Sequence, residues 1–201
     1  MVWLTSDHHF GHANIIKYCN RPYSTVGGMD RDLIYRWNCV VKDADTVFHL
    51  GDFTLGNLSV ARMYFAQLKG RIHVVSCNWH HDYRWLPNNR PFLDGCTSLS
   101  GRGVVAVGPM YVLNLPEYSP DGVHSRRLTL SHYPLRVWDV QHYGGWHAHG
   151  HTHRNLDWPA GSLVKHVGVD TCNFTPISIK AFAKEMLEIE DKGVVNEGVP
   201  G

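Results

Sequence analysis

The sequence predicts an α/β (α+β) fold, on three observations. Short apolar runs typical of buried strands alternate with segments of helical periodicity through the first 76 residues. Each strand-like run ends in polar residues, such as Ser6-Asp7-His8-His9 and Gly51-Asp52. No repeat, low-complexity tract or Pro/Gly/Ser linker separates two cores. Residues 1–190 are therefore predicted to form one domain, followed by a frayed tail over 191–201.

The first half of the chain has a β-α-β-α-β order. Strands are predicted over 1–6, 46–50 and 71–76. Leu33, Ile34, Trp37 and Val40 recur at helical spacing, which predicts a helix from about Met29. A second helix is predicted over 59–68, with a glycine at position 70 as its C-terminal stop. Open α/β sheets place their sites at the carboxyl ends of the strands, so we expect the chemistry there.

The pattern changes from Val104 onward. Residues 104–107 and 110–115 flank Gly108-Pro109 and are predicted to pair as a hairpin. Two prolines and an Asp-Gly pair predict a surface loop over 115–126. Further strands are predicted over 128–131, 146–150 and 164–169, and a closing helix over 181–189.

Composition excludes several classes of protein. With 43% hydrophobic and 18% charged residues the chain is globular, and its net charge of +1 predicts no dedicated nucleic-acid surface. No apolar run reaches membrane-spanning length, and Asp7-His8-His9 interrupts the region where a signal peptide is apolar. The five cysteines form no CxxC pair, which predicts a reducing, cytoplasmic environment without disulfides. The 15 histidines point to metal ligation or acid–base chemistry.

Five polar stretches carry the candidate chemistry, each after a strand-like run. They are Asp7-His8-His9, Gly51-Asp52, the segment 78–82, Ser131-His132-Tyr133-Pro134 and Gly150-His151-Thr152-His153. Residues two apart on a strand point to the same face, so Asp7 should project with His9, and His151 with His153. By the same rule His8 should point away from the site.

The ligand types in these stretches predict a dinuclear metal centre. Imidazole, carboxylate and amide groups together suit Mn above all, with Fe, Zn, Ni or Co as alternatives. The candidate ligands are more than one tetrahedral ion needs: Asp7, His9, Asp52, Asn78, His132, His151 and His153. Two divalent transition-metal ions about 3.5–4 Å apart would use them all, with Asp52 as the bridging carboxylate.

The order of these motifs resembles that of the calcineurin-like metallophosphoesterases, from about Val2 to Asp170. The shared order is D-x-H, G-D, Asn with nearby histidines, a lone His and G-H-x-H. The opening stretch 6–16 and Gly168-Val169-Asp170 look like a small bacterial and phage branch of that family. The resemblance implies a sandwich of two mixed β-sheets flanked by helices. It also implies that Asp7, His9 and His153 bind one ion, that Asn78, His132 and His151 bind the other, and that Asp52 bridges them.

The sequence departs from the family at one block. The family has G-N-H followed by an acid, whereas this chain has Ser76-Cys77-Asn78-Trp79-His80-His81-Asp82. The tryptophan stands where the catalytic histidine should follow Asn78, so His80 and His81 are both candidates for the general acid. His81 is favoured because Asp82 follows it. His12 and Asn14 have two open interpretations: they cap the first helix or line the substrate pocket.

Together these observations predict a cytoplasmic, metal-dependent phosphoesterase. A metal-bridging hydroxide would attack a small phosphate ester, a nucleotide among the candidates, and a histidine would protonate the leaving oxygen. Two alternatives stay open: a scaffold of the same fold with weakened catalysis, and a nuclease-like phosphodiesterase acting on single strands. A packing role is expected for His49. The other histidines are expected to be hydrogen-bonded polar groups or surface residues: His73, His124, His142, His147 and His166.

Overall fold

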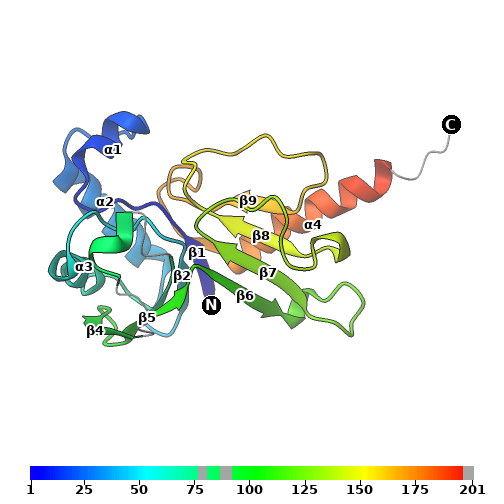
Figure 1. The fold of residues 1–201 in the computed structure, drawn as a ribbon, viewed down its shortest axis with the longest axis horizontal. Coiled ribbons are helices and arrows are strands. Elements are labelled where there is room, and N and C mark those ends of the chain that lie inside the picture. Colours follow the sequence, from blue (N-terminus) through cyan, green and yellow to red (C-terminus); the bar gives the residue numbers. More distant parts are fainter. Residues whose placement is uncertain (77–80, 87–91, 197–201) are drawn as a thin grey trace.

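The computed structural model describes residues 1–76, 81–86 and 92–196 of the chain. These residues form two mixed β-sheets that pack together and four α-helices, which confirms the predicted α/β fold with two mixed sheets (Figure 1). In Figure 1, α1 to α3 lie beside the sheet that contains β1 to β5, and α4 lies with the sheet that contains β6 to β9.

The larger sheet has six strands in the order β10-β1-β2-β3-β5-β4. Its four central strands are parallel: β1 (Val2–Thr5), β2 (Thr46–His49), β3 (Arg71–Val75) and β5 (Gly103–Gly108). The antiparallel edge strands are β10 (Ile177–Ser178) and β4 (Phe92–Thr97). Neither edge strand was expected from the sequence.

The smaller sheet has four strands in the order β6-β7-β8-β9. They are β6 (Met110–Leu115), β7 (Arg126–Ser131), β8 (Trp146–His149) and β9 (Val164–His166). The last three run parallel, and β6 is antiparallel to β7. The carboxyl ends of β7 and β8 therefore lie at the same edge of this sheet.

The predicted hairpin over 104–115 is wrong. β5 pairs with β3 and β4 in the larger sheet, whereas β6 pairs with β7 in the smaller one. The chain passes between the sheets at Gly108, which has φ +94°, and the following Pro109 has no N–H to donate. An apolar–Gly-Pro–apolar pattern is common to both arrangements, so the sequence does not separate a hairpin from a crossing between sheets.

The helices are α1 (Ala13–Tyr18), α2 (Val26–Val40), α3 (Leu58–Phe65) and α4 (Ile179–Asn196). Helix α2 begins three residues before Met29 because the Thr25 side chain accepts a hydrogen bond from the Gly28 amide and caps it. Helix α4 continues to Asn196, into the segment 191–201 where we expected a frayed tail. Among the described residues, no helix is both long enough and apolar enough to cross a membrane.

Three single-turn 3₁₀ helices lie between these elements: η1 (His81–Arg84), η2 (Pro116–Tyr118) and η3 (Gln141–Tyr143). Two apolar clusters bury the faces of the sheets. One packs Val47 and Ile72 of the larger sheet against Leu33 and Trp37 of α2. The other contains Leu4, Phe48, Leu128, Trp146 and Phe182, from both sheets and α4. The shared cluster fixes the two sheets against each other, and with them the strand ends that carry the polar stretches.

Candidate metal centre

The predicted ligands gather where the carboxyl ends of strands from both sheets meet. Six of the seven follow β1, β2, β7 and β8, and they are Asp7, His9, Asp52, His132, His151 and His153. A bridge between Ser6 and Gly168 joins the strand ends here. Asn78, the seventh predicted ligand, lies outside the described residues, as do His80, Cys77 and Trp79.

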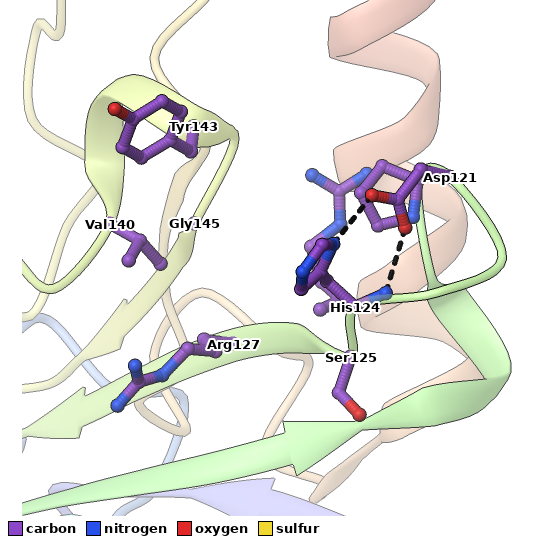
Figure 2. Close-up of a pocket in the computed structure, with 9 residues that line it drawn as sticks. Asp121, His124, Ser125, Arg127, Val140, Tyr143 and Gly145 are labelled. Carbon is purple, nitrogen blue, oxygen red and sulfur yellow. Dashed lines mark hydrogen bonds and ion pairs between the residues drawn. The ribbon is translucent and has the colours of Figure 1, made fainter.

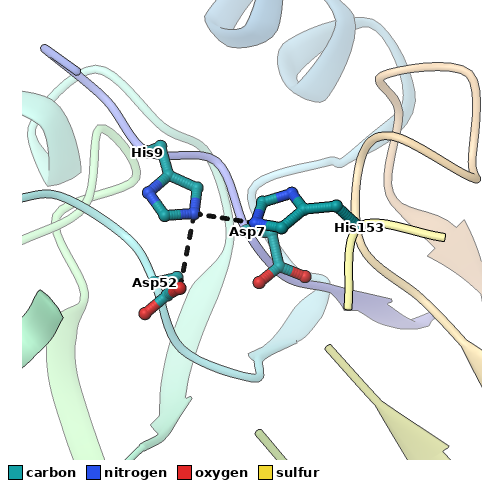
Figure 3. Close-up of side chains that lie close together, drawn as sticks. All are labelled: Asp7, His9, Asp52 and His153. Atoms are coloured by element: carbon teal, nitrogen blue, oxygen red, sulfur yellow. Dashed lines mark hydrogen bonds and ion pairs between the residues drawn. The ribbon is translucent and has the colours of Figure 1, made fainter. Parts of the chain in front are cut away.

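The first cluster comprises Asp7, His9, Asp52 and His153, each with one ligand atom within 4.8 Å of the others (Figure 3). His9 Nε2 lies 3.3 Å from His153 Nε2 and 3.3 Å from Asp52 Oδ2. Apart from His153, whose side chain is one-fifth exposed, these side chains are almost fully buried. Two carboxylates and two imidazoles converging in this way are suited to a divalent transition-metal ion.

The second cluster comprises Asp52, His132 and His151, whose ligand atoms also lie within 4.8 Å of one another. His132 Nε2 lies 3.5 Å from Asp52 Oδ1. Asp52 therefore belongs to both clusters, with Oδ2 facing His9 and Oδ1 facing His132. This is the arrangement of a carboxylate that bridges two ions.

Left-handed backbone conformations aim these ligands. Five of the six described ligands have positive φ: Asp7 (60°), His9 (53°), Asp52 (53°), His151 (69°) and His153 (54°). Such conformations are uncommon outside glycine and concentrate at functional sites. The strands β1 and β8 end at Thr5 and His149, so strand alternation does not bring the ligands together as we expected. One consequence is that His151 and His153 belong to different clusters.

Hydrogen bonds to the opposite ring nitrogen orient two of the histidines. His153 Nδ1 lies 2.7 Å from Asp170 Oδ2, and His132 Nδ1 lies 2.7 Å from the Leu50 carbonyl. Each Nδ1 donates to its oxygen, so in the neutral ring Nε2 faces the cluster as an acceptor. Burial alone would lower the pKa of His153, but the hydrogen bond to Asp170 raises it above its ordinary value. The proton held more readily because of this raised pKa is the second one, on Nε2, and a metal ion bound there would displace it.

Asp7 is held in place by its neighbours in sequence and in space. Its carboxylate accepts hydrogen bonds from Ser6 Oγ at 2.6 Å and from the His151 amide at 2.9 Å. Gly150 is needed beside it for space, because a Cβ at that position would overlap Ser6 Oγ and lie 2.8 Å from Asp7 Oδ2. The segments that follow β1 and β8 are therefore both held by contacts with the Asp7 carboxylate.

The electrostatic surroundings keep Asp7 ionised. Burial alone would raise the pKa of its carboxyl, but His166 and the nearby His132 and His153 hold it well below its usual range. His166 Nε2 lies 3.4 Å from Asp7 Oδ2, and His166 Nδ1 lies 2.8 Å from Thr171 Oγ1. His166 is thus a buried, hydrogen-bonded polar group, one of the roles expected for it, and its contact with a candidate ligand was not expected from the sequence.

His81 lies at the solvent side of the clusters. Its Nε2 is 3.9 Å from Asp52 Oδ2, its ring centroid is 5.1 Å from that of His9, and its side chain is one-third exposed. A proton donor in this position can reach both bulk water and a group bound at the clusters. Of the two candidates for the general acid, this is the one within the described residues.

The two open interpretations of His12 and Asn14 are partly resolved. His12 occupies the N-cap position of α1, but its side chain makes no capping hydrogen bond. Its ring centroid lies 5.5 Å from that of His9 and 6.1 Å from that of His81, so it borders the first cluster. Asn14 is exposed in the first turn of α1.

His8 and His49 lie outside the two clusters, as expected from the sequence. His8 points away from His9, and its Nδ1 lies 2.9 Å from His49 Nε2, beneath the site. His49 Nδ1 accepts from the Gly51 amide at 3.2 Å, so this buried pair supports the turn that carries Asp52. Burial lowers the pKa of His49 to about 3, which keeps the ring neutral.

A third group of candidate ligands, Cys19, His153 and Asp170, is unsuited to a metal ion. Arg21 Nε and Nη2 each lie 2.8 Å from a different oxygen of Asp170, so this carboxylate is already neutralised by a guanidinium. Burial also raises the pKa of the Cys19 thiol to about 11, which disfavours the thiolate that a metal requires.

A pocket of about 520 Å³ lies elsewhere, between the loop after β6 and the loop before β8 (Figure 2). Its lining includes Asp121, His124, Arg127, Val140 and Tyr143. It adjoins the start of β7, whereas His132 follows the end of that six-residue strand, so about 20 Å separates them. The pocket is therefore separate from the two clusters.

Comparisons with known proteins place the chain among relatives from archaea and phages. It is 33% identical over 190 residues to "Uncharacterized protein MJ1445" of Methanocaldococcus jannaschii, an alignment that covers 91% of this chain and 89% of that protein. It is 27% identical over 195 residues to "Gene 66 protein" of Mycobacterium phage L5, covering 84% and 86%. No protein-family model matches the chain.

One solved structure shares the fold. It is the crystal structure of the protein of unknown function AQ665 from Aquifex aeolicus, with a TM-score of 0.62. The match covers 92% of this chain and 98% of that one at 22% sequence identity, which supports the fold alone.

Proposed function

This chain belongs to the same family as protein MJ1445 of Methanocaldococcus jannaschii, and we propose that it hydrolyses phosphate esters with two divalent metal ions. The observation that carries the proposal is the sharing of Asp52 between two ligand clusters. A purely structural site would need one ion, whereas two clusters joined by a carboxylate suit a displacement at phosphorus. The order of the motifs, which resembles that of calcineurin-like metallophosphoesterases, supports the same reaction.

Bound ions would polarise the phosphoryl oxygens and lower the pKa of a water molecule, the nucleophile of the reaction. The chain itself would orient the ester and handle the protons. His81 lies near both clusters and solvent, so it would protonate the leaving oxygen and regain its proton from water. His12 borders the first cluster and would contact the substituent of the ester.

The substrate we propose is a small phosphodiester or phosphomonoester, with nucleotides among the candidates. The net charge of +1 offers little long-range attraction to a polyanion, so single-stranded nucleic acid is the less favoured alternative. We place the reaction in the cytoplasm, because the cysteines in the described part of the chain, Cys19, Cys39, Cys96 and Cys172, are all free thiols.

Metal analysis combined with a hydrolysis assay tests this function. The purified protein should hold close to two ions per chain, and should cleave bis(p-nitrophenyl) phosphate, p-nitrophenyl phosphate or both. Exhaustive chelation should abolish cleavage, and Mn²⁺ should restore it better than Mg²⁺ because imidazoles favour the softer ion. Full activity after chelation would exclude the metal-dependent reaction, and two bound ions without hydrolysis of either ester would favour the scaffold. Faster cleavage of a single-stranded oligonucleotide would favour the nuclease.

A further inference from the structure

Arg21 is a fully buried cation behind the first cluster. Its Nε and Nη2 donate to the two oxygens of Asp170, both at 2.8 Å. Its Nη2 also donates to the Asp7 carbonyl at 2.6 Å, and Nη1 donates to the His8 carbonyl at 2.9 Å. One guanidinium therefore holds both a carboxylate and the backbone of the left-handed turn after β1.

Asp170 connects this guanidinium to a candidate metal ligand. The same Oδ2 that accepts from Arg21 also accepts from His153 Nδ1, at 2.7 Å. The contact spans positions far apart in the chain: Arg21 follows α1, and Asp170 follows β9. The chain Arg21–Asp170–His153 thus supports the first cluster from the side opposite to solvent, and the Arg21 bonds to the backbone at Asp7 and His8 support it from β1.

We propose that Arg21 and Asp170 are positioning residues for the first cluster, which therefore binds its ion before the second cluster and more tightly. This inference rests on the proposed metal-dependent function. Asp170 fixes the tautomer and the orientation of His153, and Arg21 fixes the carboxylate and the turn that presents Asp7 and His9. Partners of this kind behind a ligand typically contribute about 10–100-fold to metal affinity.

The two clusters differ in charge and in the groups behind their histidines. The first cluster offers two carboxylates, and its His153 is backed by the carboxylate of Asp170. Within the described part of the chain, the second offers one carboxylate, the shared Asp52, and its His132 is backed by the uncharged Leu50 carbonyl. Asn78, predicted for the second ion, would add a neutral amide. A carboxylate behind an imidazole raises its basicity more than a carbonyl does, which favours the first cluster.

Isothermal titration calorimetry of the full, metal-free chain with Mn²⁺ tests the proposal without any substrate. The wild type should show two binding events of different affinity. Asp170→Asn keeps the shape of the side chain but cannot accept from His153 and from both Arg21 nitrogens at once. We expect it to weaken the tighter event by about 10–100-fold and the weaker event by less than about 3-fold. His132→Ala should have the reverse effect and so assign the weaker event.

Matched variants separate a positioning role from a general loss of structure. Glu190→Gln removes a carboxylate from the Arg126–Glu190 ion pair, far from the clusters, and should leave both events unchanged. Cys19→Ser should also leave both unchanged, because the third ligand group is not a metal site in this proposal. Arg21→Lys keeps the buried charge but loses the paired donors, and it should weaken the tighter event in the same direction as Asp170→Asn. Circular dichroism of each metal-free variant verifies the fold.

The outcomes distinguish this inference from the function on which it rests. Two events of unchanged affinity in folded Asp170→Asn and Arg21→Lys would overturn the positioning role while leaving the two-ion function intact. Equal weakening of both events in these variants would also overturn it, because the effect would then be global. A wild-type protein that binds no Mn²⁺ would overturn the function and the inference together.

Discussion

The carboxylate of Asp82 accepts a hydrogen bond from the backbone amide of Asp52, at 2.9 Å. It also accepts from the Phe53 amide at 3.0 Å and from Ser76 Oγ at 2.7 Å, and it is fully buried. The 3₁₀ turn η1 that presents His81 to the clusters therefore also anchors the turn that carries the bridging carboxylate. His81 and Asp52 are fixed relative to each other through one side chain.

Replacing Asp82 by alanine should destabilise the protein and loosen this turn. The change removes an acceptor that four buried donors share: the amides of Asp52 and Phe53, Ser76 Oγ and Trp85 Nε1. Trp85 Nε1 keeps a second acceptor, the Thr54 carbonyl at 3.2 Å, so the main loss falls on the two backbone amides. We expect the free energy of unfolding in urea to fall by about 3 kcal/mol or more. Asp121→Ala is a suitable control, since Asp121 also accepts from two backbone amides but is exposed to water. It should change the free energy of unfolding by less than about 1 kcal/mol, and an equal loss in both variants would contradict the anchoring role.

Asp52→Asn should impair both metal sites at once. The amide removes the negative charge that stabilises two neighbouring cations and leaves one good acceptor oxygen where two are needed. We expect the metal content to fall from two ions to one or fewer, and turnover to fall by about 10³-fold. His73→Ala, a half-buried position on β3 whose ring packs on Phe48, should leave both quantities near wild type. Wild-type metal content in Asp52→Asn would show that this carboxylate does not bridge.

The location of the candidate site could be predicted from sequence because it depends on strand ends. An apolar run followed by Asp7, Asp52 or His151 shows which residues lie at a sheet edge, and parallel strands bring such edges together. The orientation of the side chains could not be predicted. Positive φ at Asp7 and Asp52 comes from tertiary hydrogen bonds, such as that from the Asp52 amide to Asp82, and no local pattern in the sequence indicates it.

The residues behind the ligands were missed for a related reason. Arg21 is a single arginine in a loop, and its partner Asp170 lies 149 positions further along the chain. In the sequence Asp170 belongs to the Gly168-Val169-Asp170 stretch, and the resemblance assigns no role to it. His166 has no sequence neighbour that suggests a contact with Asp7, because β9 reaches the site only through the pairing of the smaller sheet. Contacts of this kind follow from topology rather than from spacing.

Stability should fall as the pH drops from about 7 to about 5. Burial lowers the pKa of His147 and that of His149 to about 4, against an ordinary value of 6.5. Both rings are neutral when folded, so the unfolded chain binds more protons between these values, and stability is lost as the pH falls below 6.5. Each ring should contribute about 2 kcal/mol to the difference between pH 7.5 and pH 5.0. Urea unfolding at the two pH values, in the presence of a chelator, measures this difference in the free energy of unfolding.

His147→Gln should reduce this pH dependence by about 2 kcal/mol, the contribution of one ring, while His142→Gln, at an exposed position, leaves it unchanged. The glutamine at position 147 keeps a donor and an acceptor for the Thr129 carbonyl and the Leu135 amide but does not titrate. Equal unfolding free energies at pH 7.5 and pH 5.0 in the wild type would contradict the assignment of neutral, buried rings.

His81→Ala should slow the hydrolysis of esters with poor leaving groups by about 10²-fold or more. The reason is the position of His81 Nε2, 3.9 Å from Asp52 Oδ2, where a proton can be passed to an oxygen departing from phosphorus. An activated aryl ester leaves without a proton, so its turnover should fall much less. The metal content should stay near two, because His81 belongs to neither cluster. Rates with alkyl and p-nitrophenyl esters of the same phosphate, measured side by side, give the comparison.

His80→Ala separates the two candidates for the general acid. His80 and His81 are neighbours in the sequence, so each must be replaced alone and both together. If His81 is the acid, the His80 variant should retain the wild-type ratio of alkyl to aryl turnover, and the double variant should match His81→Ala alone. A loss confined to poor leaving groups in His80→Ala would assign the proton to that residue instead. If the double variant hydrolyses alkyl esters like the wild type, neither histidine is the acid. The proton must then come from water or from another group near the clusters. His12 is one such group, because its ring lies 6.1 Å from that of His81.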